Sequence, residues 1–545
     1  MKLTPAHPLT RVVLLVLDGV GTGPGDAFDA VHLARTPNLD RLQREGLVTQ
    51  IRAHGTAVGL PSDSDIGNSE VGHNILGAGR VFPQGASSVE TAIANGSIWQ
   101  GCWRDIVAGL KASGGTLHLL GLLSDGNVHA HERHLYALLE RAADEGLKRA
   151  RVHVLLDGRD VMDKTAHVHI ERLEQQLATL RARGLDGTIA SGGGRMAITM
   201  DRYGADWPMV ARGWQTHVLG QGPQFGSAMD ALAAARAADP EISDQYVPPF
   251  VVAADGQPVG TVQDGDAVLL FNFRGDRAIE IARAFGEGAS FTEFDRQRVP
   301  QVAFAGMMLY DGDAGIPAQY LVAPATVSDT LSECLADSGI RQFACAETQK
   351  FGHITYFWNG NRSGKFDEAS ETYLEIPSDG VPFDQRPWMK SAETADAVLA
   401  AIADPSYAFV RANFAGGDMV GHTGKLEAAI LAVEAVDLGL GRILRAAEEQ
   451  GLCLIVTADH GNAEDMVERD GKGQPLVDAN GQPMGRTSHT RSLVPFIVRD
   501  FSGRKLVANA DVAKPGLANV AATVVELLGL APAAQFEPPL VQRAG

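Results

Sequence analysis

The sequence has few cysteines and no long hydrophobic run. Its 545 residues include four cysteines, and none of them forms a Cys-x-x-Cys pair. That number is too small for a disulfide framework or an all-cysteine zinc site. The apolar run at residues 12–17 is far shorter than the roughly 20 residues that cross a bilayer. These absences predict a reduced, cytoplasmic protein with no membrane span and no secretory signal.

Basic residues are also scarce, since 47 Lys and Arg face 66 Asp and Glu, which gives a formal net charge of −19. A chain of this charge repels phosphate backbones, so we expect no nucleic-acid partner. A small anionic ligand stays compatible with it, because a local cluster of arginines can override the overall sign. Apolar residues make up 45% of the chain, enough to bury the large cores of a soluble protein with several domains.

Short apolar runs separated by helical stretches such as 427–447 indicate an α/β fold with largely parallel sheets. Three of the runs are followed by acidic residues: 12–17 before Asp18, 407–414 before Asp418, and 452–456 before Asp459. Ligands in open α/β sheets bind beyond the carboxyl ends of the strands. We therefore expect these three carboxylates to meet at one edge of a sheet.

A second set of apolar runs ends differently. Residues 117–123, 152–156 and 268–273 lead into segments that carry arginines as well as acidic residues. This difference in chemistry predicts two domains. We assign residues 1–82 and 322–545 to a discontinuous metal-binding domain, and residues 83–321 to an inserted substrate-binding domain.

Aspartates and histidines near these strand ends have the spacing of metal ligands. A single such residue is more often a helix cap or a hydrogen-bonded core residue than a ligand. Six together favour a two-metal site, and mixed Asp and His donors suit Mn, Zn, Co or Fe better than calcium. The six are Asp18, Asp418, His422, Asp459, His460 and His489. By contrast, we interpret His167 and His169 as part of a solvated helix face.

Ser69 lies in a polar, glycine-rich segment that precedes a predicted helix. A serine in this position is often a helix cap. A serine hydroxyl becomes a nucleophile only when a base or a metal activates it. No Gly-x-Ser-x-Gly motif surrounds Ser69, so a hydrolase-type triad is not indicated. A two-metal site could supply the activation instead.

Several motifs, in order along the chain, together closely resemble cofactor-independent phosphoglycerate mutases. They are Asn68-Ser69-Glu70-Val71-Gly72-His73, the segment from Leu122 to His129, Asp157-Gly158-Arg159-Asp160, Asp418-Met419-Val420-Gly421-His422-Thr423-Gly424 and Thr457-Ala458-Asp459-His460-Gly461-Asn462. The resemblance implies the alkaline phosphatase superfamily fold, with a central mostly parallel sheet and an inserted α/β transferase domain. It also implies interconversion of 3-phosphoglycerate and 2-phosphoglycerate without 2,3-bisphosphoglycerate, a step of glycolysis and gluconeogenesis.

The resemblance also implies roles for single residues. Asp18, Ser69, Asp459 and His460 would bind one divalent ion, and Asp418, His422 and His489 a second; Mn²⁺ is expected, with Co²⁺ or Mg²⁺ as substitutes. Ser69 would carry the phosphoryl group, with Asp160 and Lys350 as the other catalytic residues. The substrate-binding set would be His129, Arg159, Asp160, Arg195, Arg202, Arg274, Arg277 and Lys350.

Two alternatives from the sequence stay open at this point. One is another enzyme of the same superfamily, a phosphatase or a phosphopentomutase, which would share the metal ligands but would not explain the arginines of the inserted segment. The other is a metal-stabilised binding protein, which would have no need of a nucleophilic serine. A monomer is what the resemblance implies, with 2- and 3-phosphoglycerate as its only partners.

Overall fold

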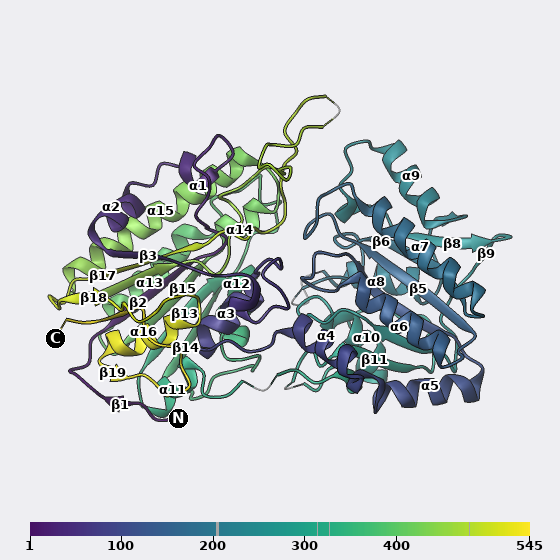
Figure 1. The fold of residues 1–545 in the computed structure, drawn as a ribbon, viewed down its shortest axis with the longest axis horizontal. Coiled ribbons are helices and arrows are strands. Elements are labelled where there is room, and N and C mark those ends of the chain that lie inside the picture. Colours follow the sequence, from purple (N-terminus) through teal and green to yellow (C-terminus); the bar gives the residue numbers. More distant parts are fainter. Residues whose placement is uncertain (203–205, 313, 326, 479, 545) are drawn as a thin grey trace. The chain divides into compact units, whose positions relative to one another are not determined.

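The computed structural model describes residues 1–202, 206–312, 314–325, 327–478 and 480–544, and its chain forms two compact units (Figure 1). Unit 1 contains Met1–Gln84 and Thr326–Gly545, and unit 2 contains Gly85–Ala325. Unit 2 is therefore a continuous segment inserted into a discontinuous unit 1.

Unit 1 is built on a seven-stranded sheet. In spatial order its strands are β14 (Glu371–Ile376), β13 (Gln342–Glu347), β15 (Phe409–Phe414), β2 (Val12–Leu17), β16 (Cys453–Thr457), β17 (Val494–Asp500) and β3 (Leu47–Ile51). The first five are parallel to one another, and β17 is antiparallel to both of its neighbours. Two small antiparallel pairs complete the unit, β1 (Thr4–Pro5) with β19 (Leu530–Ala531) and β18 (Leu506–Ala508) with β20 (Val541–Arg543).

Helices cover both faces of this sheet (Figure 1). One layer consists of α1 (Ala30–Leu33), α2 (Pro37–Glu45), α13 (Ser391–Ala403) and α15 (Leu426–Glu449). The other consists of α3 (Ser69–Ala78), α11 (Leu331–Asp337) and α16 (Asn519–Leu528). Two short helices, α12 (Thr348–Gly352) and α14 (Gly416–Gly421), follow strands directly and stand near the sheet edge.

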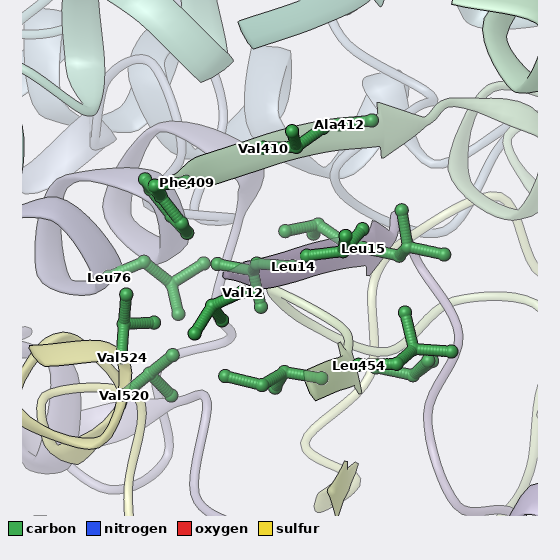
Figure 2. Packing of buried hydrophobic residues seen from close by; sticks show 14 of the residues in the cluster. Val12, Leu14, Leu15, Leu76, Phe409, Val410, Ala412, Leu454, Val520 and Val524 are labelled. Atoms are coloured by element: carbon green, nitrogen blue, oxygen red, sulfur yellow. The ribbon is translucent and has the colours of Figure 1, made fainter. Parts of the chain in front are cut away.

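The central strand β2 has the sequence VVLLVL, and all six residues are buried. A strand with helices on both faces needs apolar side chains on both, which explains why the run does not alternate with polar residues. Figure 2 shows Leu76 from α3 with Val520 and Val524 from α16 packed around this strand. The core of unit 1 thus holds β2 rigidly, and with it the residue that follows, Asp18.

Unit 2 has its own sheet. In spatial order its strands are β12 (Tyr320–Val322), β11 (Ala303–Met308), β10 (Ala267–Leu270), β4 (Leu117–Leu123), β5 (Arg149–Leu156), β6 (Asp186–Gly194), β8 (Phe250–Ala254) and β7 (Gln224–Phe225), with β9 (Gln257–Pro258) paired to β8. The strands from β12 to β6 are parallel. The helices are α4 (Gly85–Asn95), α5 (Cys102–Ser113), α6 (Glu132–Asp144), α7 (Ala166–Ala182), α8 (Trp207–His217), α9 (Ala228–Ala238) and α10 (Ile279–Gly286).

The structure confirms the predicted fold class, since both units are α/β with mostly parallel sheets. The runs at 12–17 and 117–123 are strands with those bounds, and the predicted helix 427–447 is α15. In the described part of the chain, none of the helices combines the length and the apolar character that a membrane crossing needs.

Candidate active site

In unit 1, three neighbouring parallel strands bring acidic side chains to one edge of the sheet. Asp18 follows β2, Asp418 lies in the first turn of α14 just after β15, and Asp459 follows β16. All three are at most 2% exposed. Because β15, β2 and β16 are adjacent and parallel, their carboxyl ends point the same way. The strand-end pattern seen in the sequence therefore produces one cluster.

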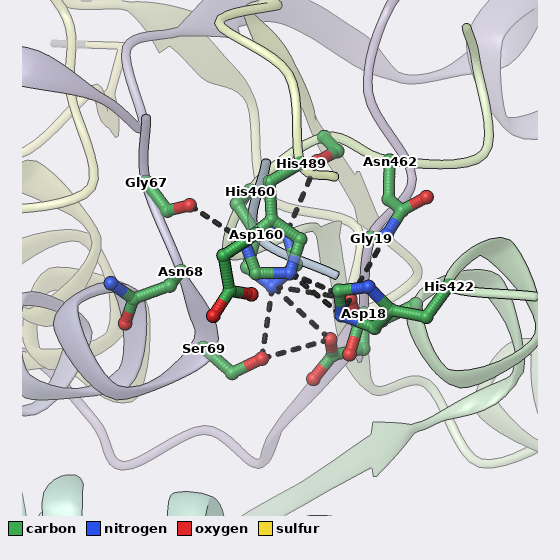
Figure 3. Close-up of polar contacts among 12 residues, drawn as sticks. Asp18, Gly19, Gly67, Asn68, Ser69, Asp160, His422, His460, Asn462 and His489 are labelled. Atoms are coloured by element: carbon green, nitrogen blue, oxygen red, sulfur yellow. Dashed lines mark hydrogen bonds and ion pairs between the residues drawn. The ribbon is translucent and has the colours of Figure 1, made fainter. Parts of the chain in front are cut away.

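Asp418 forms the first candidate metal group with His422 and His489. Figure 3 shows these two histidines close to each other. The Nε2 atoms of the two histidines lie 3.0 Å apart, and Asp418 Oδ1 lies 3.0 Å from one and 3.1 Å from the other. Each Nδ1 faces a backbone carbonyl, at 2.6 Å for His422 and 2.9 Å for His489, so each Nδ1 carries the ring proton. Two nitrogen lone pairs and a carboxylate then converge on one point, which is an arrangement that a cation stabilises.

The second group surrounds Ser69. His460 Nε2 lies 2.9 Å from Ser69 Oγ, 3.4 Å from Asp18 Oδ1 and 3.6 Å from Asp459 Oδ2. Ser69 is the first residue of α3, and Asn68 is the helix cap, because its side chain accepts a hydrogen bond from Val71 N. The structure thus excludes the capping role considered for Ser69. Its hydroxyl instead lies at a helix N-terminus, where the helix dipole favours negative charge.

Lys350 lies in α12, the short helix that follows β13, and its side chain projects into the same cluster. Its Nζ lies 2.6 Å from Ser69 Oγ and 2.6–2.7 Å from carboxylate oxygens of Asp18 and Asp418. Burial alone would lower the pKa of the Lys350 ammonium, but the carboxylates of Asp18, Asp418 and Asp459 raise it above its ordinary value. Lys350 is therefore a cation held against the serine hydroxyl.

The charges of this cluster do not balance within the protein. Three buried carboxylates face one lysine. Burial opposes ionisation of Asp418, yet His422 and Lys350 hold the pKa of that carboxyl well below its usual range. Burial would likewise lower the pKa of His460, but Asp459, Asp18 and Asp418 raise it to about 9. A divalent ion would take the place of the proton on His460, and ionised carboxylates with neutral imidazoles form the donor set that divalent transition metals prefer. The residues therefore fit a metal site.

Unit 2 has the opposite chemistry at the carboxyl edge of its own sheet. His129 follows β4, Arg159 and Asp160 follow β5, and Arg195 follows β6. Arg274 and Arg277 follow β10, so the predicted substrate-binding residues of this unit gather at the ends of parallel strands. Lys350 alone among the predicted set belongs to unit 1.

Three aspartates partly neutralise five buried or nearly buried arginines in unit 2. Arg195 pairs with Asp160 and with Asp157, at 2.7 Å from the latter. Arg202 lies 2.6 Å and Arg274 lies 3.0 Å from carboxylate oxygens of Asp276. Arg159 and Arg277 complete the cluster. Its excess of positive charge makes it a candidate site for an anion.

The pKa shifts of two residues in this cluster also indicate a site for an anion. Burial lowers the pKa of Arg277, and the neighbouring Arg202, Arg159 and Arg195 lower it further against the opposing effect of Asp276. Burial, with Arg195 and Arg274, also holds the pKa of His129 well below its ordinary value, so this imidazole is neutral. A bound anion would relieve the repulsion among these guanidinium groups.

Comparisons with known proteins identify the family. Residues 10–532 match the family model described as the metalloenzyme superfamily. A 2,3-bisphosphoglycerate-independent phosphoglycerate mutase of Trypanosoma brucei brucei is 53% identical over 98% of both chains. The chain belongs to this mutase family. A homologue from Zea mays bearing the same name is 49% identical, with 99% of this chain and 98% of the homologue covered.

A solved structure extends the match to three dimensions. The crystal structure of Leishmania mexicana phosphoglycerate mutase at low cobalt concentration has a TM-score of 0.97 with this chain, at 50% identity and complete coverage of both. Membership of the mutase family, predicted from the ordered motifs, is therefore confirmed. The roles of single residues stay predictions, which the geometry above supports.

Sequence reasoning missed the residues that support the cluster in unit 1. The Asn413 amide donates to Asp18 Oδ2 at 2.6 Å and to His73 Nε2 at 3.1 Å. His73 Nδ1 in turn lies 2.8 Å from Ser69 O and 3.2 Å from Asp459 Oδ2. One signal could have identified Asn413, because it is a polar residue inside the otherwise largely apolar strand β15.

The interpretation of His169 as part of a solvated helix face was wrong. Its side chain is buried, and Nδ1 lies 2.8 Å from Glu132 Oε2. Asp125, Glu132 and His169 form another group with metal-like spacing among the described residues. Arg172 lies 3.0–3.1 Å from both of these acidic side chains. Arg172 and a protonated His169 thus balance the two carboxylates of this group.

Proposed function

We propose that the chain interconverts 3-phosphoglycerate and 2-phosphoglycerate through a phosphoserine on Ser69, without 2,3-bisphosphoglycerate. The observation that carries this proposal is the buried Ser69 hydroxyl, which lies 2.6 Å from Lys350 Nζ and 2.9 Å from His460 Nε2. The names of the relatives support the same reaction.

Two divalent ions, Mn²⁺ ahead of Co²⁺ or Mg²⁺, would be held in unit 1. Asp418, His422 and His489 would hold one, and Asp18, Ser69, Asp459 and His460 the other. When bound, such ions lower the pKa of a ligated hydroxyl and neutralise phosphoryl oxygens. The Leishmania mexicana mutase, whose structure was determined at low cobalt concentration, supports a divalent ion.

The chain's own groups then account for the first transfer. Ser69 Oγ, which has given up its proton to solvent before the substrate reacts, attacks phosphorus, and the bond between phosphorus and the substrate oxygen breaks. Lys350 stabilises the charge on Oγ and on the transferring group, and the N-terminus of α3 adds to this effect. The departing glycerate oxygen gains a proton, for which we propose Asp160 as the relay.

The second transfer requires glycerate to stay bound and to present its other hydroxyl. We assign this retention to His129, Arg159, Arg195, Arg202, Arg274 and Arg277 of unit 2. Guanidinium groups bind carboxylate and phosphate in a bidentate manner, so the cluster suits a substrate that carries both. The attacking hydroxyl returns its proton to Asp160, the bond between phosphorus and Ser69 Oγ breaks, and Ser69 is restored in its deprotonated form.

The arginine cluster also separates this proposal from its rivals. A phosphatase needs the groups of unit 1 only, and a binding protein needs no serine beside a lysine. Neither accounts for five arginines around three aspartates in unit 2. We further propose a cytoplasmic monomer with no nucleic-acid or membrane partner, which agrees with the four free cysteines and the acidic composition.

A coupled assay tests the proposal. The purified protein with Mn²⁺ receives 3-phosphoglycerate, and enolase reports the 2-phosphoglycerate formed. We expect full activity without added 2,3-bisphosphoglycerate and no increase when it is added. A strict requirement for 2,3-bisphosphoglycerate would contradict the mechanism, and phosphate release without 2-phosphoglycerate would indicate a phosphatase.

A further inference from the structure

A continuous chain of buried polar side chains crosses the sheet of unit 2. From Asp266, before β10, it runs through His118 on β4, His153 on β5 and Ser191 on β6 to His217 at the end of α8. The successive contacts are 3.1, 2.9, 2.7 and 2.8 Å, and a last contact of 3.1 Å joins His217 Nε2 to Thr199 Oγ1. All of these residues are buried. Nothing in the proposed reaction uses them.

The direction of every hydrogen bond in this chain follows from its Asp266 end. Asp266 accepts hydrogen bonds from the backbone N–H groups of Thr116 and Gln263. Burial alone would raise the pKa of this carboxyl, but the two backbone bonds and the bond with His118 lower it, so the carboxylate is ionised. His118 must then donate to it, and each later group donates to the one before. Burial lowers the pKa of all three histidines, and that of His217 to about 3, so each imidazole is neutral and donates and accepts once.

At the other end, the Thr199 hydroxyl donates to His217. Thr199 has a φ of +70°, a left-handed conformation that is strained for a β-branched residue. Met209, Gly213 and His217 lie at intervals of four residues along α8, and they hold Thr199 in this conformation. Thr199 N donates to Met209 O at 3.1 Å, and His217 accepts from its hydroxyl. Gly213 leaves room between them, since a Cβ at that position would lie 2.1 Å from Thr199 Oγ1.

The residues just after Thr199 belong to the anion cluster. The carbonyl of Met200 accepts a hydrogen bond of 2.7 Å from Arg277 Nη1. Arg202, two residues further on, pairs with Asp276. The strained turn at Thr199 therefore sets the direction of a segment that contains Arg202 and accepts a hydrogen bond from Arg277. Strain of this kind persists only where the surrounding structure enforces it.

We propose that Thr199 is a positioning residue for substrate binding, and that the His217 end of the buried chain holds it in the conformation that places Arg202 and the Met200 carbonyl. This inference rests on the proposed role of Arg202 and Arg277 in binding phosphoglycerate. Thr199 itself takes no part in the chemical steps. Its loss should therefore weaken substrate binding and leave the turnover of bound substrate nearly unchanged.

Two matched pairs of variants in the full-length enzyme test the inference. Thr199→Ser keeps the hydroxyl, and Thr199→Val removes it with little change of shape. His217→Gln places an amide near the position of Nε2, which faces Thr199, whereas His217→Asn places one near Nδ1, which faces Ser191. The KM for 3-phosphoglycerate and kcat are measured in the enolase-coupled assay. Hydrogen exchange is measured at the Asp201 amide, which donates to Thr199 O at 3.0 Å.

We expect Thr199→Val and His217→Asn to raise KM about tenfold, to change kcat less than about threefold, and to speed exchange at Asp201. Thr199→Ser and His217→Gln should stay within about twofold of wild type in KM. Equal KM values for the two members of both pairs would overturn the inference, as would a loss confined to kcat. In the His217 pair, the variant expected to bind substrate normally, His217→Gln, is the one that loses the contact to Ser191, so a general loss of stability from a broken hydrogen bond would not produce the expected order.

Arg202→Ala and Arg277→Ala separate this inference from the proposed function. If both leave KM unchanged, the proposed substrate site is wrong and the inference falls with it. If they raise KM while Thr199→Val does not, the inference alone is wrong.

Discussion

Unit 1 and unit 2 share an architecture, a mostly parallel sheet with helices, and differ in the charge that they collect. In both, parallel strands deliver polar residues to the carboxyl edge of a sheet. Unit 1 gathers Asp18, Asp418 and Asp459 with histidines and one lysine, which leaves an excess of negative charge. Unit 2 gathers five arginines around three aspartates, which leaves an excess of positive charge. One edge therefore suits cations and the other suits anions.

This difference shows that the fold determines where a site lies, and that the residues at the strand ends determine what it binds. A reaction that moves a phosphoryl group between two hydroxyls of one molecule needs both kinds of site. In the proposed reaction, the groups of unit 1 would activate the serine and those of unit 2 would retain the glycerate. The predictions below test this division of roles.

Removal of divalent ions should have the largest effect, and it should act on unit 1 alone. We expect a chelator to abolish mutase activity and Mn²⁺ to restore it more fully than Co²⁺ or Mg²⁺, because three buried carboxylates need a counter-charge. Hydrogen exchange should speed up in peptides from residues 409–422 and stay unchanged in peptides from residues 149–160. Full activity in a metal-free preparation would refute the metal site.

Ser69→Ala should have the second largest effect, a loss of mutase activity of about 10⁴-fold or more, because it removes the nucleophile. The matched control is Ser64→Ala, at an exposed serine of the segment that precedes α3, which should keep wild-type activity. Mass spectrometry of enzyme quenched with substrate should find phosphate on the peptide that contains Ser69. Phosphate found on a histidine instead would show that Ser69 is not the nucleophile.

Arg159→Ala and Asp160→Ala test unit 2 while every metal ligand stays in place. We expect mutase turnover to fall at least about a hundredfold, or about 2.7 kcal/mol, because glycerate escapes before the second transfer. Inorganic phosphate released per mutase turnover should rise above wild type, and Arg183→Ala, at an exposed arginine of the same unit, should change neither value. A fall in phosphate release in strict proportion to turnover would contradict the retention role.

We expect the smallest effect at the group that Asp125, Glu132 and His169 form with Arg172 in unit 2. Burial alone would lower the pKa of His169, but Glu132 and Asp125 raise it above its ordinary value. The stability that it contributes is fully present below the unfolded pKa of about 6.5 and is lost as pH rises through the folded pKa. Calorimetry should therefore show that His169→Asn lowers Tm more at pH 5.5 than at pH 8.5, by about 1–3 °C. The same difference for His167→Asn, on the same helix, would point to a general effect of pH.

The strand ends of unit 1 could be predicted from the sequence because an apolar run followed by a carboxylate is a local pattern. The run at 12–17 and the Asp18 that follows it are an example, and β2 has those bounds. Family membership followed from the ordered motifs. Both predictions depend on residues that are close together in the chain.

Features that depend on distant partners could not be predicted. The strand β6 has the sequence DGTIASGGG, which lacks the apolar pattern of a buried strand. Its glycines pack against other parts of the chain, for example Gly187 against Leu177 of α7 and Gly194 against the Gln245 segment. His118 and His153 are single polar residues within apolar runs, and only the pairing of β4 with β5 brings them together. His169 looked exposed because its partner Glu132 lies on another helix.

The insertion of unit 2 into unit 1 has a consequence for synthesis on the ribosome. The central strand β2 ends at Leu17, but its two neighbours in the sheet, β15 and β16, begin only at Phe409 and Cys453. At about 5–20 residues per second, β2 waits roughly 20–90 s before it can pair. Unit 2 is complete well before that and can fold first. During this interval an all-apolar hexapeptide stays unpaired, so the nascent chain should depend on chaperones at this segment more than anywhere in unit 2.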